Sequence, residues 1–398
     1  MKYRYLDLRR SVMQRNLQVR ATMNQAIRTF LSEKNGFLEV ETPILFRSTS
    51  EGAREFLVPT ERISPGSSYA LTQSPQQFKQ MLMAAGVHRY YQIARCFRDE
   101  DLRADRQPEF TQLDIEMAFV SAEEVMDIME RTVRMLWQGS LHSDPFPKMT
   151  YREALARYGS DKPDLRSDMQ IQTVFENGDS TTEELCLDLD HYRMVKEMLP
   201  DCVKVEEKRE SAILTATRRH DDHVGQTSLG RIRTALIRKL LGARGSTEFK
   251  FLWVTDFPLL RRTEDKFESM HHPFTAPHPD DMESLQDSLA TNDPSKLLTI
   301  RGQHYDLVLN GCEIGGGSIR IHDGQLQEQL FRQALNLKSM EQFAHLLGAL
   351  RSGCPPHGGM ALGLDRIYAL LCGTDSIRDI IAFPKNGRGI DLCVNAPA

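Results

Sequence analysis

The 398 residues include 40% hydrophobic and 26% charged side chains, and the net charge is −5. This composition is typical of a globular protein with room for more than one domain, and it excludes a disordered or fibrous chain. The small negative charge gives no general attraction to nucleic acid, so an RNA partner would need a local basic surface. No apolar run reaches the roughly 20 residues that cross a bilayer, so we expect no membrane partner.

The cysteines give no sign of a structural framework. Seven are scattered along the chain without a C-x-x-C pair, which indicates neither disulfides nor zinc and fits a reducing compartment. The histidines of SMHHPFTAPHP invite a zinc interpretation, but neighbours on an extended chain point to opposite sides and no Cys or Glu completes a set.

The chain opens with a predicted helix and strand. Apolar residues at steps of three, four or seven predict a long amphipathic helix between Leu8 and Lys34, and Gly36 is placed to end it. In the strand-like FLEVETPIL that follows, Pro43 indicates an edge, a bulge or an interface. The predicted helix stripe consists of Val12, Val19, Met23, Ile27, Phe30 and Leu31.

A second helix start lies in YALTQSPQQFKQMLM. Ser74 is suited to cap the helix, with Pro75 at its first position. Gln76 and Lys79 then lie one turn apart and face a common point.

Residues 90–117 read as a hairpin around a charged loop. Alternation places Asp114 and Glu116 on the face that also carries Arg98, and the opposite face is apolar. An arginine among carboxylates suits a ligand with phosphate and ammonium groups. A solvated hairpin with surface ion pairs is an equally good interpretation of this stretch alone.

A second dense stretch is YDLVLNGCEIGGGSIRIH. Its N-G turn signal lets Asp306 and Glu313 face each other across a hairpin and hold a hard cation, for which magnesium on ATP phosphates is the natural occupant. The glycines do not form a P-loop. The alternative is a glycine-rich hairpin with surface acids.

Three segments together resemble the motifs of class II aminoacyl-tRNA synthetases. FRDEDLRADRQPEF is similar to motif 2 in the bacterial-type and mitochondrial aspartyl enzymes, the segment ending at Pro43 resembles motif 1, and HGGMALGLDRIYALL resembles motif 3. RYLDLRR also belongs to this pattern, so we assign the basic N-terminus to the folded protein. The Rossmann and HIGH signatures of class I are missing.

The resemblance implies a fold and its domains. We expect an α+β class II catalytic core, with an antiparallel β-sheet flanked by helices and an inserted α/β domain. The core would occupy residues 1–162, with motifs 1 and 2, and residues 249–398, with the metal and ATP hairpin and motif 3. A shortened insertion would occupy residues 163–248, where no catalytic constellation appears.

The resemblance also implies roles for individual residues. The catalytic residues would be Arg98, Glu313 and Arg366, and the metal ligands Asp306 and Glu313. Aspartate would be bound by Glu51, Ser74, Gln76, Lys79, Asp114, His271 and Arg320. ATP would be bound by Arg98, Asp99, Glu100, Gln107, Glu313, Gly363, Leu364, Asp365 and Arg366.

The implied activity is ATP-dependent ligation of L-aspartate to tRNA(Asp) by a homodimer with Mg²⁺. A paralogue that forms aspartyl-adenylate for asparagine synthesis or protein modification is one alternative. The other is a non-catalytic dimer, which would be expected to have lost Arg98, Glu313 or Arg366. The family's N-terminal anticodon-binding barrel is expected to be absent from this chain, which leaves open whether the chain is a fragment and whether it charges tRNA(Asn). The resemblance is closest to animal mitochondrial enzymes, which predicts the mitochondrial matrix, with a bacterial cytoplasm as the alternative.

Overall fold

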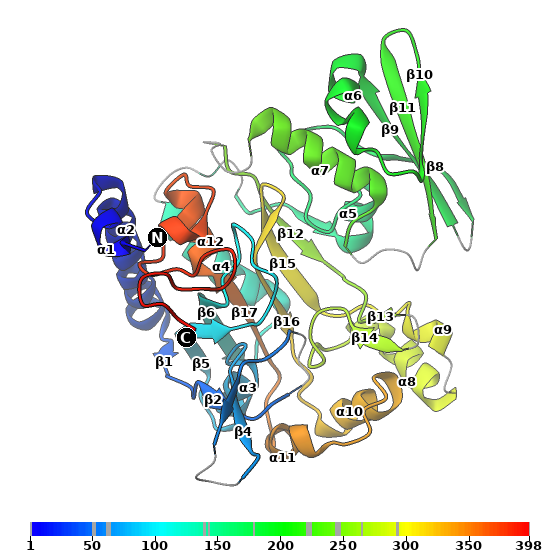
Figure 1. The fold of residues 1–398 in the computed structure, drawn as a ribbon. Coiled ribbons are helices and arrows are strands. Elements are labelled where there is room, and N and C mark those ends of the chain that lie inside the picture. Colours follow the sequence, from blue (N-terminus) through cyan, green and yellow to red (C-terminus); the bar gives the residue numbers. More distant parts are fainter. Residues whose placement is uncertain are drawn as a thin grey trace.

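The computed structural model describes residues 2–49, 53–60, 65–137, 141, 144–177, 180–219, 225–242, 248–263, 266–291 and 294–397. Its centre is an eight-stranded sheet in the order β1-β5-β6-β17-β16-β15-β12-β7 (Figure 1). Neighbouring strands are antiparallel except at the two edges, where β1 pairs with β5 and β7 with β12 in parallel. The strands are β1 Leu38–Glu39, β5 Arg89–Phe97, β6 Glu109–Ala118, β7 Lys148–Thr150, β12 Phe251–Thr255, β15 His304–Leu309, β16 Cys312–Ile319 and β17 His357–Gly363.

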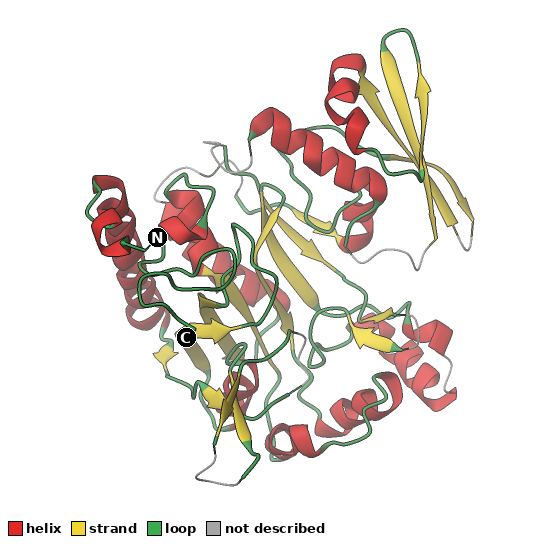
Figure 2. Ribbon diagram, viewed as in Figure 1, coloured by secondary structure: helices red, strands yellow, loops and turns green. Residues whose placement is uncertain are grey.

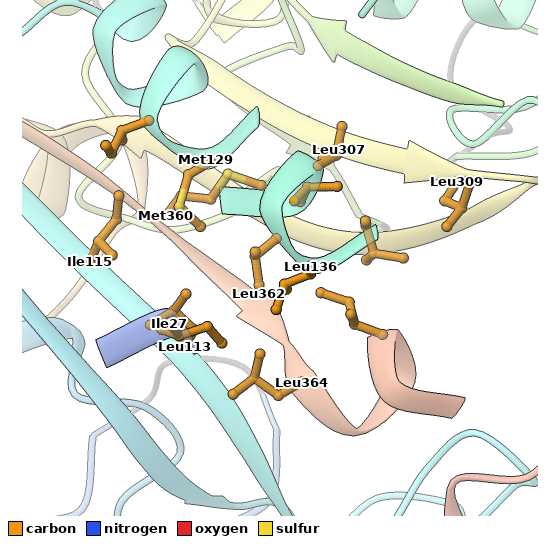
Figure 3. Close-up of a cluster of buried hydrophobic side chains, with 14 of the residues drawn as sticks. Ile27, Leu113, Ile115, Met129, Leu136, Leu307, Leu309, Met360, Leu362 and Leu364 are labelled. Carbon is orange, nitrogen blue, oxygen red and sulfur yellow. The ribbon is translucent and has the colours of Figure 1, made fainter. Parts of the chain in front are cut away.

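Helices cover this sheet and confirm the predicted α+β class (Figure 2). Helix α4, Ala122–Trp137, buries side chains at helical spacing against the sheet. Leu113 and Ile115 alternate into the same core from β6, where Leu362 meets them from β17 (Figure 3). The other main helices are α2 Ser11–Arg28, α3 Gln76–Ala84, α8 Met282–Thr291, α10 Gly324–Gln329, α11 Ala344–Arg351 and α12 Leu364–Leu371.

The N-terminal segment is part of the folded protein. Buried Arg4, in the short helix α1 (Arg4–Asp7), donates hydrogen bonds to the carbonyl oxygens of Arg378, Ile381 and Ala382. Helix α2 continues into a π-helical turn at Thr29–Lys34, and Gly36 follows it in the left-handed region with φ +67°.

One position of the predicted helix stripe is wrong. Val12 is 46% exposed, and Met13 is buried in its place. Because a helix turns by 3.6 residues, spacing alone left the first turn of the stripe ambiguous by one position.

The predicted insertion contains a sheet of its own. Its strands are antiparallel in the order β10-β11-β9-β8, and α6 and α7 cover one face around a separate hydrophobic cluster. Helix α5, Tyr151–Tyr158, precedes the predicted boundary and also packs against α7, while the boundary itself stays a prediction. The elements are β8 Gln172–Asn177, β9 Ser180–Asp188, β10 Val203–Glu207, β11 Ser211–Arg219, α6 Leu189–Val195 and α7 Ser228–Leu241.

Smaller elements complete the core. Strands β2 Leu45–Phe46, β3 Leu57–Pro59 and β4 Ser68–Leu71 form one small sheet, and β13 Leu260–Arg262 pairs with β14 Phe267–Ser269. Across the described ranges, no helix combines the length and apolarity needed to cross a membrane.

Candidate active site

A cavity of about 590 Å³ opens over β6, β16 and β17, with the starts of α3 and α12 and the loop after β5 in its wall. Most of the predicted site residues contribute to this wall. They are Ser74, Gln76, Lys79, Arg98, Glu100, Gln107, Asp114, His271, Glu313, Arg320, Gly363, Asp365 and Arg366.

Four predicted residues are not among those wall residues. Asp99 points to Arg54, with 3.8 Å between the Asp99 carboxylate and Arg54 Nε, and Leu364 is buried in the main core. The Asp306 carboxylate forms a hydrogen bond with His304 Nε2 at 2.7 Å. Glu51 lies outside the residues that the structure describes.

At one end of the cavity, two cations share two carboxylates. Lys79 Nζ lies 3.2 Å from Asp114 Oδ1 and 3.3 Å from Glu116 Oε2. Arg320 Nε donates to Glu116 Oε1 at 3.0 Å, and Arg320 Nη1 donates to Ser318 Oγ at 2.7 Å. All four charged side chains are at most 2% exposed, so this end is a dry cluster of paired charges.

The environment shifts the two carboxyl pKa values in opposite directions. Burial would raise the pKa of Glu116, but Arg320 and Lys79 outweigh it and hold that pKa below the usual range. For Asp114 burial dominates, so its pKa lies above the usual range although Lys79 acts against this. Glu116 is therefore the firmly ionised member of the pair.

Two polar atoms at this end have no hydrogen-bond partner among the residues that the structure describes. They are the acceptor Asp114 Oδ2 and the donor Gln76 Nε2, both buried. Leaving such atoms unpaired costs roughly 1–3 kcal/mol each, so native structures rarely do so without a function. A ligand with one ammonium and one carboxylate group would satisfy both.

Ser74 also lines this end but does not cap α3 as predicted. The helix begins at Gln76 with Pro75 in the cap position, and no side chain caps it. Pro75 has ψ 19°, so the backbone turns into the helix one residue later than expected. The Ser74 hydroxyl is thereby not used as a helix cap.

At the other end of the cavity lies the positively charged guanidinium group of Arg98. Its guanidinium carbon lies 5.1 Å from the centre of the Phe110 ring, and the group makes no hydrogen bond or ion pair within the described part of the chain. Glu100, which a solvated hairpin would offer to Arg98, pairs with Arg106 at 3.0 Å instead. The ion-pair interpretation of this hairpin therefore fails for its central arginine.

Two predicted ATP residues direct their polar atoms to the protein. The Gln107 amide exchanges two hydrogen bonds with the Lys385 backbone, at 2.8 and 3.1 Å. Asp365 accepts from the backbone N–H of Thr111 at 2.7 Å and pairs with Arg20. These contacts position the wall of the cavity, and direct ATP binding by the two side chains stays a prediction.

Arg366 and the carboxylate hairpin meet at the same end. Arg366 Nη1 donates to the backbone oxygen of Glu313, and Nη2 lies 3.5 Å from Asp105 Oδ2. Glu313 Oε2 in turn lies 3.1 Å from Lys162 Nζ. Burial would raise the pKa of Glu313, but Lys162 and Arg366 hold it below the usual range.

The predicted hairpin is confirmed, although its two carboxylates are not paired directly across the strands. Asn310 and Gly311 form the turn with φ of 49° and 75°. Glu313 lies opposite Val308, and Asp306 lies opposite Gly316 on the far side of an irregularity between Leu307 and Val308. The two carboxylates still influence each other, since burial and then Glu313 raise the pKa of Asp306 against the effect of His304. This oxygen-rich end fits a hard cation such as Mg²⁺.

Comparison with known proteins agrees with this geometry. Residues 1–387 match the family described as tRNA synthetases class II (D, K and N). The chain belongs to this family. An aspartate–tRNA(Asp/Asn) ligase of Symbiobacterium thermophilum is 43% identical over 100% of this chain and 76% of its own. A mitochondrial aspartate–tRNA ligase of Rattus norvegicus is also 43% identical, over 100% of this chain and 69% of its own.

A solved structure supports the fold. The asparaginyl-tRNA synthetase of Entamoeba histolytica, in complex with asparaginyl-adenylate, superposes with a TM-score of 0.64 at 17% identity, covering 97% of this chain and 70% of that one. The class II synthetase core expected from the sequence is confirmed.

Three residues that contact predicted site residues were missed in the sequence. Glu116 was on the predicted polar face of β6, two residues after Asp114, and this alternation was the signal that could have identified it. His304 bonds Asp306 at 2.7 Å and stacks on His271 with ring centres 3.9 Å apart. Lys162 is far from Glu313 in sequence, and no local pattern connects the two.

We expect Glu116→Gln to destabilise the protein by about 3 kcal/mol, because Arg320 and Lys79 lose a shared buried charge. Asp114→Asn on the same strand should cost little or even stabilise at pH 7, because burial penalises the ionised form of Asp114. Thermal unfolding followed by circular dichroism measures both.

The pH dependence of the stability loss in Glu116→Gln provides a control for this prediction. Ionised Glu116 stabilises the fold at pH values above the unfolded glutamate pKa of about 4.3, and this contribution disappears as the pH falls through the lower folded pKa. The deficit of Glu116→Gln should therefore shrink in acid. Equal losses for the two variants at pH 7 would contradict the assignment.

Proposed function

We propose that this chain is an ATP-dependent aspartate–tRNA ligase that forms aspartyl-adenylate and transfers the aspartyl group to the 3′ end of tRNA(Asp). The observation that carries the proposal is a single cavity with a buried amino-acid end and a cationic phosphate end. The relatives named aspartate–tRNA ligase, matched over the whole chain, support it.

The first step needs no side-chain nucleophile. An oxygen of the aspartate α-carboxylate attacks the α-phosphorus of ATP, a new P–O bond forms, and the bond to the bridging oxygen breaks to release pyrophosphate. Arg98 is the cation available to neutralise the negative charge that develops on the α-phosphate. Gln76, Asp114 and Ser74 orient the amino acid, so catalysis consists of positioning and charge stabilisation.

Aspartate is selected over asparagine by charge. Lys79 and Arg320 are the cations nearest the amino-acid end, and both are held in fixed positions by Glu116. Replacing a side-chain carboxylate by an amide removes charge-assisted hydrogen bonds to these cations, which costs several kcal/mol.

Magnesium would be held by Glu313 and Asp306, together with the phosphates of ATP. It would supply positive charge to the transferring phosphoryl group. Arg98 and Arg366 would supply the remaining positive charge at the phosphate end of the cavity.

We expect Arg98→Ala to slow aspartate-dependent exchange of labelled pyrophosphate into ATP by about 100-fold or more, since charge stabilisation of a transition state is commonly of this size. Stability should be unchanged, because the guanidinium has no hydrogen-bond or ion-pair partner in the described part of the protein. Asparagine and glutamate serve as substrate controls in the same assay.

Arg89→Ala is the matched control for this variant. Arg89 begins the strand that leads to Arg98 and also lies over an aromatic ring, 5.8 Å from the centre of Phe37, but it is outside the cavity wall. Full exchange activity in Arg98→Ala, or an equal loss in Arg89→Ala, would remove the proposed role of Arg98.

We also propose that the chain forms a homodimer through the segment that resembles motif 1. β1 is an edge strand of the central sheet, and apolar side chains around it are unusually exposed: Leu38 by 55%, Leu45 by 47% and Ile44 by 45%. An open strand edge beside apolar side chains is suited to pair with a second copy.

The double variant Leu38→Lys/Leu45→Lys should sediment as a single chain, because two buried charges would oppose association. The wild type should sediment with the mass of two chains in analytical ultracentrifugation. Val174→Lys, at a 50% exposed apolar position of β8, is the control and should remain dimeric. A wild-type monomer would contradict the dimer.

For the compartment we propose the mitochondrial matrix, on the resemblance of RGQHYDLVLNGCEIGGGSIRIH to animal mitochondrial enzymes. Relatives with mitochondrial and bacterial names match at the same identity. A fluorescent fusion of the complete gene product should coincide with a matrix marker under the microscope. A diffuse cytosolic signal would contradict this location.

A further inference from the structure

Lys162, the last residue before the predicted insertion, contacts the carboxylate hairpin of the site. It lies between α5 and β8, and its Nζ is 3.1 Å from Glu313 Oε2 and 3.2 Å from Asp161 Oδ2. Its side chain is 35% exposed, so solvent or a ligand reaches the ammonium group.

The backbone that carries Lys162 is firmly held. The N–H of Asp161 donates to the Gly225 oxygen at 2.8 Å, and the N–H of Lys162 donates to Ser160 Oγ at 3.1 Å. Gly225 has φ +84°, and a Cβ there would come within 2.7 Å of the Asp161 carboxylate. This packing therefore holds the backbone of Lys162 in an ordered segment rather than in a loose loop.

The same segment, residues 161–164, contacts the turn between β15 and β16. A Cβ added to Gly311 would lie 3.1 Å from Cβ of Asp164, so the two backbones approach closely at this point. Lys162 and Glu313 thus belong to two segments that are fixed against each other by backbone packing as well as by charge.

The carboxylates near Lys162 favour a cation at this position. Asp161, Asp306 and Glu313 are close enough to act on one another electrostatically, and they would repel a polyphosphate. An ammonium has three N–H donors, and two acceptors are within reach here.

We propose that Lys162 is a further substrate-binding residue, whose ammonium group contacts the β- or γ-phosphate of ATP beside Glu313. The proposal rests on the proposed function in that ATP is the substrate. Arg366, which contacts the backbone oxygen of the same glutamate, would be the second cation at this position. The segment that leads into the predicted insertion would then contribute one residue to the adenylation site.

A purely structural ion pair makes a different prediction. Its loss would lower stability and weaken all nucleotides alike, or none of them. A contact with the terminal phosphates affects ATP and pyrophosphate but leaves AMP unchanged. Comparing these ligands therefore separates the two interpretations without relying on turnover.

The experiment is equilibrium dialysis of labelled ATP, AMP and pyrophosphate against the full chain with Mg²⁺ and without aspartate. Lys162→Met should weaken ATP and pyrophosphate binding about tenfold or more, as expected for a lost charge-assisted contact, and change AMP binding less than about twofold. Lys162→Arg should retain part of the affinity because it keeps the charge. Lys162→Gln replaces the Met variant if circular dichroism shows that the latter is unfolded.

Lys250→Met is the matched control. Lys250 is 37% exposed and lies 3.0 Å from Glu248, a carboxylate that is not in the cavity wall, whereas Glu313, the partner of Lys162, is in that wall. This variant should bind all three ligands like the wild type. Unchanged ATP affinity in Lys162→Met, or equal weakening of ATP and AMP, would overturn the proposal.

Failure of the proposed function has a separate signature. A wild type that binds ATP but shows no aspartate-dependent exchange would refute the ligase while the dialysis still decides the role of Lys162. A wild type that binds neither ATP nor pyrophosphate would overturn both.

Discussion

The buried pairing of Glu116 with Lys79 and Arg320 is the interaction on which the site depends. It ties α3, β6 and the end of β16 together with charge-assisted bonds of 3.0 to 3.3 Å. Removing three charges from water costs far more than any one pair returns, so the cluster is stable only when every member is paired. The fold therefore has to hold these elements in one arrangement, and the amino-acid end of the cavity is preorganised as a result.

Preorganisation explains how such a site performs chemistry without a nucleophile. The groups that orient the amino acid are in place before it binds, and the few unpaired atoms, such as Asp114 Oδ2 and Gln76 Nε2, are the ones a zwitterion would satisfy. Fixed dipoles and charges need no reorganisation as the transition state forms, which is the most effective form of electrostatic stabilisation.

The sequence allowed prediction of what depends on local periodicity. Alternation along β6 placed Asp114 correctly, and the N-G turn predicted the hairpin of Glu313. What it could not predict depends on backbone detail or on distant contacts. In that hairpin Glu313 pairs with Val308 and Asp306 with Gly316, so the two carboxylates are not cross-strand partners, and Pro75 delayed the start of α3 by one residue. Lys162 meets Glu313 only through tertiary packing at the edge of the predicted insertion.

The two ends of the cavity differ in how tightly their charges are held. At the ATP end the pairs are partly exposed, as in Glu100 with Arg106, Arg366 with Asp105, and Lys162 with Glu313. Exposed pairs are worth roughly 0–1 kcal/mol, so a polyphosphate can draw these cations away from their carboxylates at little cost. The buried aspartate end cannot rearrange in this way. The site thus combines a rigid end that selects a small amino acid with an adaptable end that binds a large, highly charged nucleotide.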